Sequence, residues 1–158
     1  MASVKERLLD PQIRPLVVRD CCALIDQAVK STKGFSGIAV KGAYQAVKAI
    51  KPRFVEGVVD ALLDDWVGKL ELFEKEHEGK PGTLGDYLIE QRVRVSESLI
   101  SVTDERAETT KHKTAAKFYH RLRPSALTHT EQAVPELARL VTTYGAADFK
   151  PPAAAANP

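Results

Sequence analysis

The chain has 158 residues, of which 44% are hydrophobic and 28% are charged, and its formal net charge is +2. These values predict one globular domain and argue against a disordered chain, and the small net charge gives no global reason to expect nucleic-acid binding. No apolar run approaches the roughly 20 residues of a membrane-spanning helix. Cys21 and Cys22 are adjacent and therefore poorly placed to bond to each other, so we expect reduced thiols and a cytoplasmic protein.

Two helices are predicted at the start of the chain. Ser3 and Glu6 have the spacing of a capping box, which predicts a short helix that stops before Pro11. Pro15 fits the first turn of a second helix, because a proline there gives up no intrahelical hydrogen bond. This second helix is expected to end at residues 31–34.

The next two predicted helices are rich in apolar residues. One is expected from a Ser36 cap to about Lys51, with small residues on one side that allow close packing. The other starts at Pro52 and runs to about His77, and its wide apolar face predicts the longest helix of the chain. We expect this helix at the centre of the domain, with Trp66 at its heart.

The second half of the chain is less regular. Residues 79–82 break the long helix, and Thr83 with Asp86 predicts the cap of a new helix over residues 84–102. Residues 113–123 have a helical pattern that Pro124 is expected to interrupt. A last helix, begun or kinked by Pro135, is predicted to run to Tyr144.

The fold class follows from these elements. No segment alternates β-branched and polar residues between turn signals, so no strand is predicted. We expect a compact all-α bundle of five to seven helices with a long central helix. Residues 1–145 should form one domain, followed by a disordered tail rich in alanine and proline at residues 146–158.

Charged residues are sorted into two neighbouring blocks. Residues 27–55 hold six bases and no acid, whereas residues 56–78 hold eight acids and two bases. Because the link at residues 51–52 is short, the two helices are expected to fold back as antiparallel neighbours whose opposite charges meet. In this antiparallel arrangement the expected pairs are Lys48 with Glu56, Lys41 with Asp60 and Asp64, Lys33 with Glu71, and Lys30 with Glu74. The alternative interpretation is that one of the two blocks faces a binding partner.

A second basic stretch, residues 111–123, contains no acid and is the candidate partner-binding segment. Phe118 and Tyr119 lie within it, and bases with aromatic side chains can contact phosphates and stack on nucleobases. The same aromatic residues are spaced as a helical core stripe, so both interpretations stay open. The candidate binding residues are Lys111, Lys113, Lys117, Arg121 and Arg123.

No catalytic residue, metal site or cofactor is predicted. Glu74 and His77 have the spacing of one half of a di-iron motif, but a second copy is missing. Glu105, Glu108 and His112 share a polar helix face that is expected to be solvated. There is no phosphate-binding loop, nucleophile elbow or zinc-type spacing of cysteine and histidine.

One segment carries a resemblance to known proteins. The run KGFSGIAVK at residues 33–41, followed by AVKAIKP at residues 46–52, resembles the hallmark of a family of small bacterial helical proteins of unknown function. GDYL at residues 85–88 and VTD at residues 102–104 are also similar, and the likeness covers about residues 3–144. The resemblance implies a compact bacterial cytoplasmic domain and carries no catalytic role.

The sequence therefore predicts a non-enzymatic helical interaction or scaffolding module that binds another protein or itself. The alternative is a polyanion-binding protein that holds nucleic acid or anionic lipid through residues 111–123. A helical metalloenzyme is a third, more distant interpretation.

Overall fold

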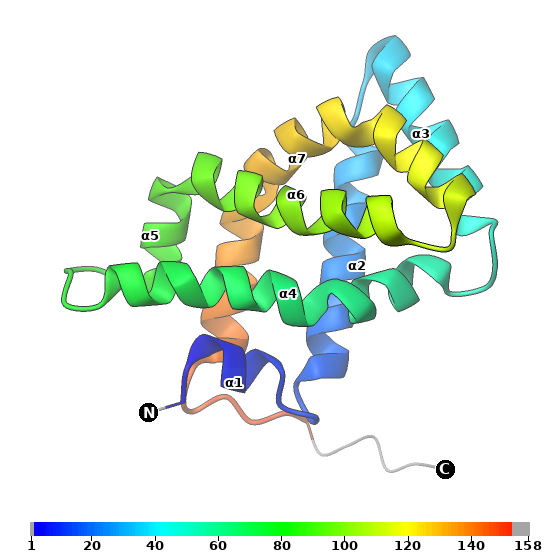
Figure 1. The fold of residues 1–158 in the computed structure, drawn as a ribbon. Helices are drawn as coiled ribbons and strands as arrows, with labels where there is room; N and C mark the ends of the chain where they lie inside the picture. Colours follow the sequence, from blue (N-terminus) through cyan, green and yellow to red (C-terminus); the bar gives the residue numbers. More distant parts are fainter. Residues whose placement is uncertain (1, 153–158) are drawn as a thin grey trace.

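The computed structural model describes residues 2–152, and this part of the chain forms seven helices and no strand (Figure 1). The all-α prediction is thereby confirmed. No helix in the described range is long and apolar enough to cross a membrane. The helices are α1 (Val4–Leu8), α2 (Arg14–Lys30), α3 (Gly34–Lys48), α4 (Phe54–His77), α5 (Leu84–Glu90), α6 (Arg92–Thr109) and α7 (Lys113–Gly145).

Two long helices organise the domain. α4 has 24 residues and α7 has 33, so the prediction that the segment after Pro52 forms the longest helix is wrong. Each of the five other helices packs against both α4 and α7. The space between the two long helices is therefore bridged from several sides, and α4 shares the central position with α7.

α7 runs without interruption through Pro124 and Pro135, contrary to the predicted break. A proline inside a helix removes one backbone donor and crowds the preceding turn, which bends the helix. Figure 1 shows α7 changing direction along its length, so that its first half lies beside α3 and α6 while its second half runs down towards α1. The two prolines thus let one helix wrap around the others.

Two predicted helix caps are confirmed. The Ser3 hydroxyl accepts from the Glu6 amide at 3.2 Å, and the Glu6 carboxylate accepts from the Ser3 amide at 2.8 Å, which completes the capping box. The Thr83 hydroxyl accepts from the Asp86 amide at 3.1 Å. Both caps satisfy amide groups that have no partner within the helix.

Two predicted boundaries are wrong. The N-cap position of α3 is Lys33, whose side chain makes no capping hydrogen bond, and not Ser36, because the chain already turns into the helix at Gly34. The segment predicted as one helix over residues 84–102 is divided at Gln91, where α5 ends and α6 begins. Gly34 lies directly at the start of α3, whereas Gln91 marks the division between α5 and α6 without a proline or glycine at the boundary.

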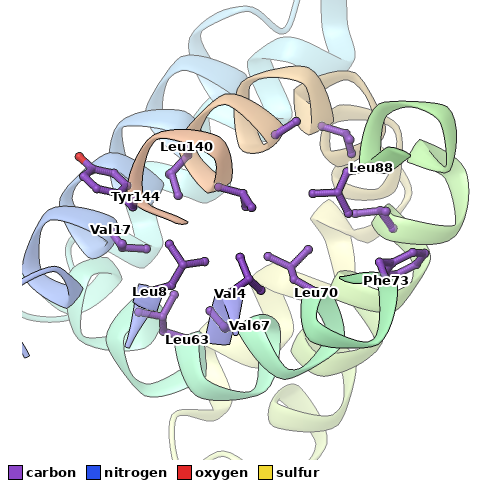
Figure 2. Close-up of a cluster of buried hydrophobic side chains, with 14 of the residues drawn as sticks. Val4, Leu8, Val17, Leu63, Val67, Leu70, Phe73, Leu88, Leu140 and Tyr144 are labelled. Atoms are coloured by element: carbon purple, nitrogen blue, oxygen red, sulfur yellow. The ribbon is translucent and has the colours of Figure 1, made fainter. Parts of the chain in front are cut away.

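The core lies where α1, α2, α4, α5 and the second half of α7 meet (Figure 2). Leu8, Val17, Val67, Leu88 and Val134 are each at most 1% exposed. Trp66 is half-buried and packs against this core without being part of its buried centre, so the expectation that it forms the heart of the core is wrong. Its indole Nε1 donates to the Leu99 carbonyl at 3.1 Å, which ties α4 to α6.

The two charge blocks do not pair as predicted. Arg14 of α2 holds the acidic residues of α4, with 2.9 Å from its Nε to Asp60 Oδ1 and 2.9 Å from its Nη1 to Asp64 Oδ1. Lys48 lies 4.0 Å from Asp26 instead of meeting Glu56. Three other acids of the block have other partners: Glu56 pairs with Arg53, Glu74 accepts from the Val4 amide, and Glu76 pairs with Arg94.

The reason is the turn between α3 and α4. Arg53 has a left-handed φ of 60°, and the chain leaves α3 in a direction that places this helix beside α7 rather than along α4 (Figure 1). Over the described residues, no ion pair involves Lys30, Lys33 or Lys41. These three lysines of the basic block therefore have no acidic partner among the described residues.

The predicted tail begins with residues that are packed. Phe149 lies edge-on to Tyr144 with 5.0 Å between the ring centroids, and a guanidinium nitrogen of Arg7 donates to the Ala146 carbonyl. Ala146 and Phe149 of the predicted tail therefore contact α1 and α7. Residues 153–158 of the predicted tail lie outside the described part.

Candidate functional site

A cavity of about 800 Å³ adjoins the core. Side chains from α2, α3, α4, α6 and α7 form its walls, and most of this wall surface is apolar, although Arg106, His129 and several threonines also line it. Its volume falls in the range of roughly 300–1,000 Å³ that is typical of small-molecule sites. Representative wall residues are Leu24, Ile25, Val58, Trp66, Leu99 and Leu137.

These six wall residues are only half-buried although each belongs to the apolar stripe of its helix. A helix periodicity of 3.6 marks which face turns inward, and that face can meet either another side chain or a hollow. Because the cavity opens to solvent, it is filled by water or by a ligand.

Exposed basic residues line the cavity. Lys51 follows α3, and Lys111 and His112 precede α7; all three line the cavity and are exposed. The His112 ring lies edge-on to Phe54 at 5.0 Å, and Lys51 Nζ lies 5.9 Å from the centroid of the same Phe54 ring. The connections α3–α4 and α6–α7 therefore meet around Phe54, and we call Lys51, Lys111 and His112 the basic rim.

Two polar side chains in the wall are held in their uncharged forms. Burial raises the pKa of the Cys21 thiol to about 12, so this cavity-lining thiol stays protonated at neutral pH. The Tyr44 hydroxyl donates to Asp26 at 2.6 Å, and burial together with this hydrogen bond raises the pKa of Tyr44. A protonated thiol is a poor nucleophile, so Cys21 contributes to the wall as a small apolar side chain.

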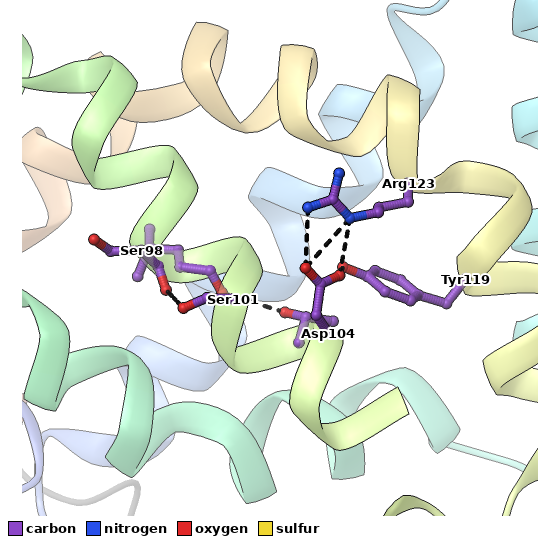
Figure 3. A network of polar contacts seen from close by, with 7 residues as sticks. Ser98, Ser101, Asp104, Tyr119 and Arg123 are labelled. Carbon is purple, nitrogen blue, oxygen red and sulfur yellow. Dashed lines mark hydrogen bonds and ion pairs between the residues drawn. The ribbon is translucent and has the colours of Figure 1, made fainter. Parts of the chain in front are cut away.

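A polar network joins α6 to α7 beside the cavity (Figure 3). Asp104 accepts from the Tyr119 hydroxyl at 2.7 Å and from Arg123 Nη2 at 3.0 Å. The Arg123 guanidinium lowers the pKa of Asp104 through this hydrogen bond, and the Tyr119 hydroxyl acts in the same direction. Burial and the Asp104 carboxylate raise the pKa of Tyr119. The network fixes the angle between two helices that form cavity walls.

All five candidate binding residues from the basic stretch are exposed: Lys111, Lys113, Lys117, Arg121 and Arg123. They do not form one set. Arg123 is held by Asp104, Lys111 belongs to the basic rim, and the Arg121 guanidinium lies 5.7 Å from the Phe118 ring centroid. Phe118 is half-buried, and Tyr119 is tied to Asp104. The segment thus keeps its charge at the surface while its aromatic rings turn towards the domain.

Glu74 and His77, which have the spacing of one half of a di-iron motif, have structural partners. Both Glu74 oxygens lie 3.1 Å from the Val4 amide nitrogen and cap α1, and His77 Nε2 lies 2.9 Å from the Gly82 carbonyl. Within the described residues, no three or more His, Cys, Asp and Glu side chains are grouped so that they could hold a metal ion.

The cavity and its rim were missed by sequence reasoning. The sequence feature that indicates the cavity is that five different helices carry apolar stripes, which is more apolar helix surface than the neighbouring helices cover. Without the helix arrangement, these stripes are indistinguishable from ordinary core residues.

Comparison with known proteins gives a family without an assigned role. The model of a family of unknown function, DUF6918, matches residues 4–145. The resemblance to a family of unknown function is thereby confirmed. No curated protein and no solved structure matches the chain.

Proposed function

The chain belongs to this family of unknown function, and we propose that it is a non-enzymatic binding module whose ligand is an elongated apolar molecule with an anionic end. The observation that carries the proposal is the apolar cavity of about 800 Å³. Water gains little from walls that offer few hydrogen-bond partners, whereas an apolar ligand gains from each surface that it removes from water.

The charge of the ligand follows from the basic rim. An apolar chain that fills the cavity leaves its polar end at the mouth, next to Lys51, Lys111 and His112. A carboxylate or phosphate at that point gains charge-assisted hydrogen bonds with the two lysines. A purely apolar molecule would fill the same space without this contribution.

Trp66 provides an internal reporter of binding, because it is the single tryptophan and lines the cavity. We expect hexadecanoate to shift and change its emission in a saturable titration, and to displace anilinonaphthalene sulfonate. The variant Ala126→Phe places a ring in the cavity and should weaken hexadecanoate at least tenfold. Ala61→Phe is the matched control, since Ala61 is an exposed residue of α4 outside the cavity wall.

The rim is tested with a charged and an uncharged ligand. Lys51→Met with Lys111→Met should weaken hexadecanoate but leave hexadecanol nearly unchanged. If neither ligand binds, or if Ala126→Phe with a native circular dichroism spectrum binds as the parent does, the proposal fails. An equal loss of affinity for both ligands in the double lysine variant would refute only the part of the proposal that gives the ligand an anionic end.

Binding of a protein partner or of a polyanion is a second proposal for the function of this chain. Lys111, Lys113, Lys117 and Arg121 are exposed, and no described residue forms an ion pair with them. This supports a surface for a negatively charged protein or nucleic acid, which salt-dependent retention on RNA would reveal. A bacterial, cytoplasmic setting is part of the proposal, and two unpaired thiols fit a reducing compartment.

A further inference from the structure

The start of α3 exposes two large apolar side chains to solvent. Phe35 is 93% exposed and Ile38 is 70% exposed, and no large apolar side chain in the described part is more exposed than these two. They are three residues apart in one helix, so they lie on the same face. Singly exposed apolar residues are common on protein surfaces, but an almost fully exposed phenylalanine beside an exposed isoleucine forms a patch.

Lysines surround this patch. Lys33 precedes Phe35, and Lys41 follows Ile38 by three residues on the same face; with both apolar residues they border one shallow surface hollow. Lys30, at the end of α2, is exposed as well. Residues 27–55 contain no acid, and neither does the segment 113–130 in the half of α7 that lies beside α3 (Figure 1). The patch is therefore apolar at its centre and positive around it.

The patch sits on a fixed projection. Figure 1 shows the turn between α2 and α3 at an outer extremity of the molecule. Gly34 has a φ of 73°, which turns the chain sharply into α3. A Cβ at Gly37 would lie 2.8 Å from the backbone carbon of Thr32, so α3 returns in close contact with the end of α2. Phe35 and Ile38 are thus held outward by packed backbone.

We propose that the start of α3 docks on an anionic lipid surface, with Phe35 and Ile38 inserted at the headgroup boundary and Lys30, Lys33 and Lys41 on the anionic headgroups. Apolar side chains flanked by lysines are the composition that binds the membrane interface, because insertion removes apolar surface from water while the ammonium groups stay at the headgroups. The charge complementarity favours lipid over a neutral protein surface.

Vesicle sedimentation tests the proposal. The intact chain should bind vesicles of phosphatidylcholine with phosphatidylserine and bind pure phosphatidylcholine much more weakly. Phe35→Ala with Ile38→Ala should weaken binding by about tenfold or more, since a buried Phe or Ile side chain carries that much free energy. Lys33→Gln and Lys41→Gln should each cost about fivefold, a loss that added salt reproduces.

The matched control is Leu72→Ala with Val93→Ala. Leu72 and Val93 are 53% and 49% exposed and lie in α4 and α6, outside the patch. Equal losses in the control and the Phe35/Ile38 variant would overturn the proposal, as would equal binding to both kinds of vesicle. A dimer in sedimentation velocity that Phe35→Ala dissociates would instead assign the patch to a second copy of the chain.

This inference stands independently of the cavity ligand. Ala126→Phe should still bind vesicles when it no longer binds hexadecanoate. Conversely, Phe35→Ala with Ile38→Ala should still bind hexadecanoate in solution, because neither residue lines the cavity.

Discussion

Alanine at Gly37 tests the close approach between α2 and α3 that gives α3 its direction. A Cβ at this position would lie 2.8 Å from both the carbonyl carbon and the oxygen of Thr32, whereas ordinary contacts begin near 3.4 Å. The obstructing atoms are backbone, so they cannot move aside as the end of a side chain can. Gly42 lies in the same helix and has no neighbouring atom within 4 Å of a built Cβ, which makes it the matched control.

The expected magnitudes follow from two opposing effects. Glycine to alanine inside a helix stabilises by up to about 1 kcal/mol, because it reduces the freedom of the unfolded chain and raises helix propensity. Overpacking against fixed neighbours costs typically 1–3 kcal/mol. Gly42→Ala should therefore be stabilising by up to about 1 kcal/mol. Gly37→Ala should be less stable than Gly42→Ala by about 1–3 kcal/mol, since the gain is common to both variants.

Thermal and urea unfolding followed by circular dichroism give the measurement. For a domain of this size, 1 kcal/mol corresponds to about 2–4 °C in Tm, so the two variants should differ by roughly 2–12 °C. Equal stability of Gly37→Ala and Gly42→Ala would show that the backbones of α2 and α3 are not in close contact, and the fixed projection of the α3 patch would lose its basis.

Two further predictions concern titratable groups. Asp104→Asn should destabilise by about 1 kcal/mol at pH 7, because Arg123 and Tyr119 lose a charged acceptor. The pKa of Asp104 is lowered in the folded state, so its contribution is present above the unfolded pKa of about 3.9 and is lost as pH falls through the folded pKa. The stability difference between parent and variant should therefore vanish in acid, and a difference unchanged down to pH 2 would contradict the assigned ion pair. Burial raises the pKa of Cys21 to about 12, whereas the less buried Cys22 has a pKa that is raised less, so Cys21 should react with a disulfide reagent at pH 8 far more slowly than Cys22. Bound hexadecanoate should slow the reaction of Cys21 further. Equal rates for the two thiols would refute the placement of Cys21 in the cavity wall.

The helices and several of their ends could be predicted because their causes are local. The Ser3 capping box, the Thr83 cap and Pro15 in the first turn of α2 depend only on residues within a few positions of each other. The periodicity of a helix determines which of its residues share one face, so the apolar stripes could also be recognised in the sequence. The predicted break at Pro124 was wrong because the cost of a proline inside a helix is local, whereas the packing that keeps α7 continuous involves distant parts of the chain.

The charge pattern shows where local reasoning ends. The basic and acidic blocks are a property of the sequence, but opposite charges attract only if the fold makes them neighbours. Arg14 took the acids predicted for Lys41, since α2 and not α3 lies along that part of α4. The choice between these partners depends on the turn at Arg53, which no pattern in the blocks encodes.

The sequence by itself determined that this chain is helical, which faces of its helices are apolar, and that residues 27–55 are basic without acids. Only the tertiary structure decided that some apolar faces meet in a packed core while others surround a cavity, and that Phe35 and Ile38 project from a basic surface. The physical reason is that periodicity and composition describe a residue's own preference for water. What the residue meets instead depends on how distant segments pack.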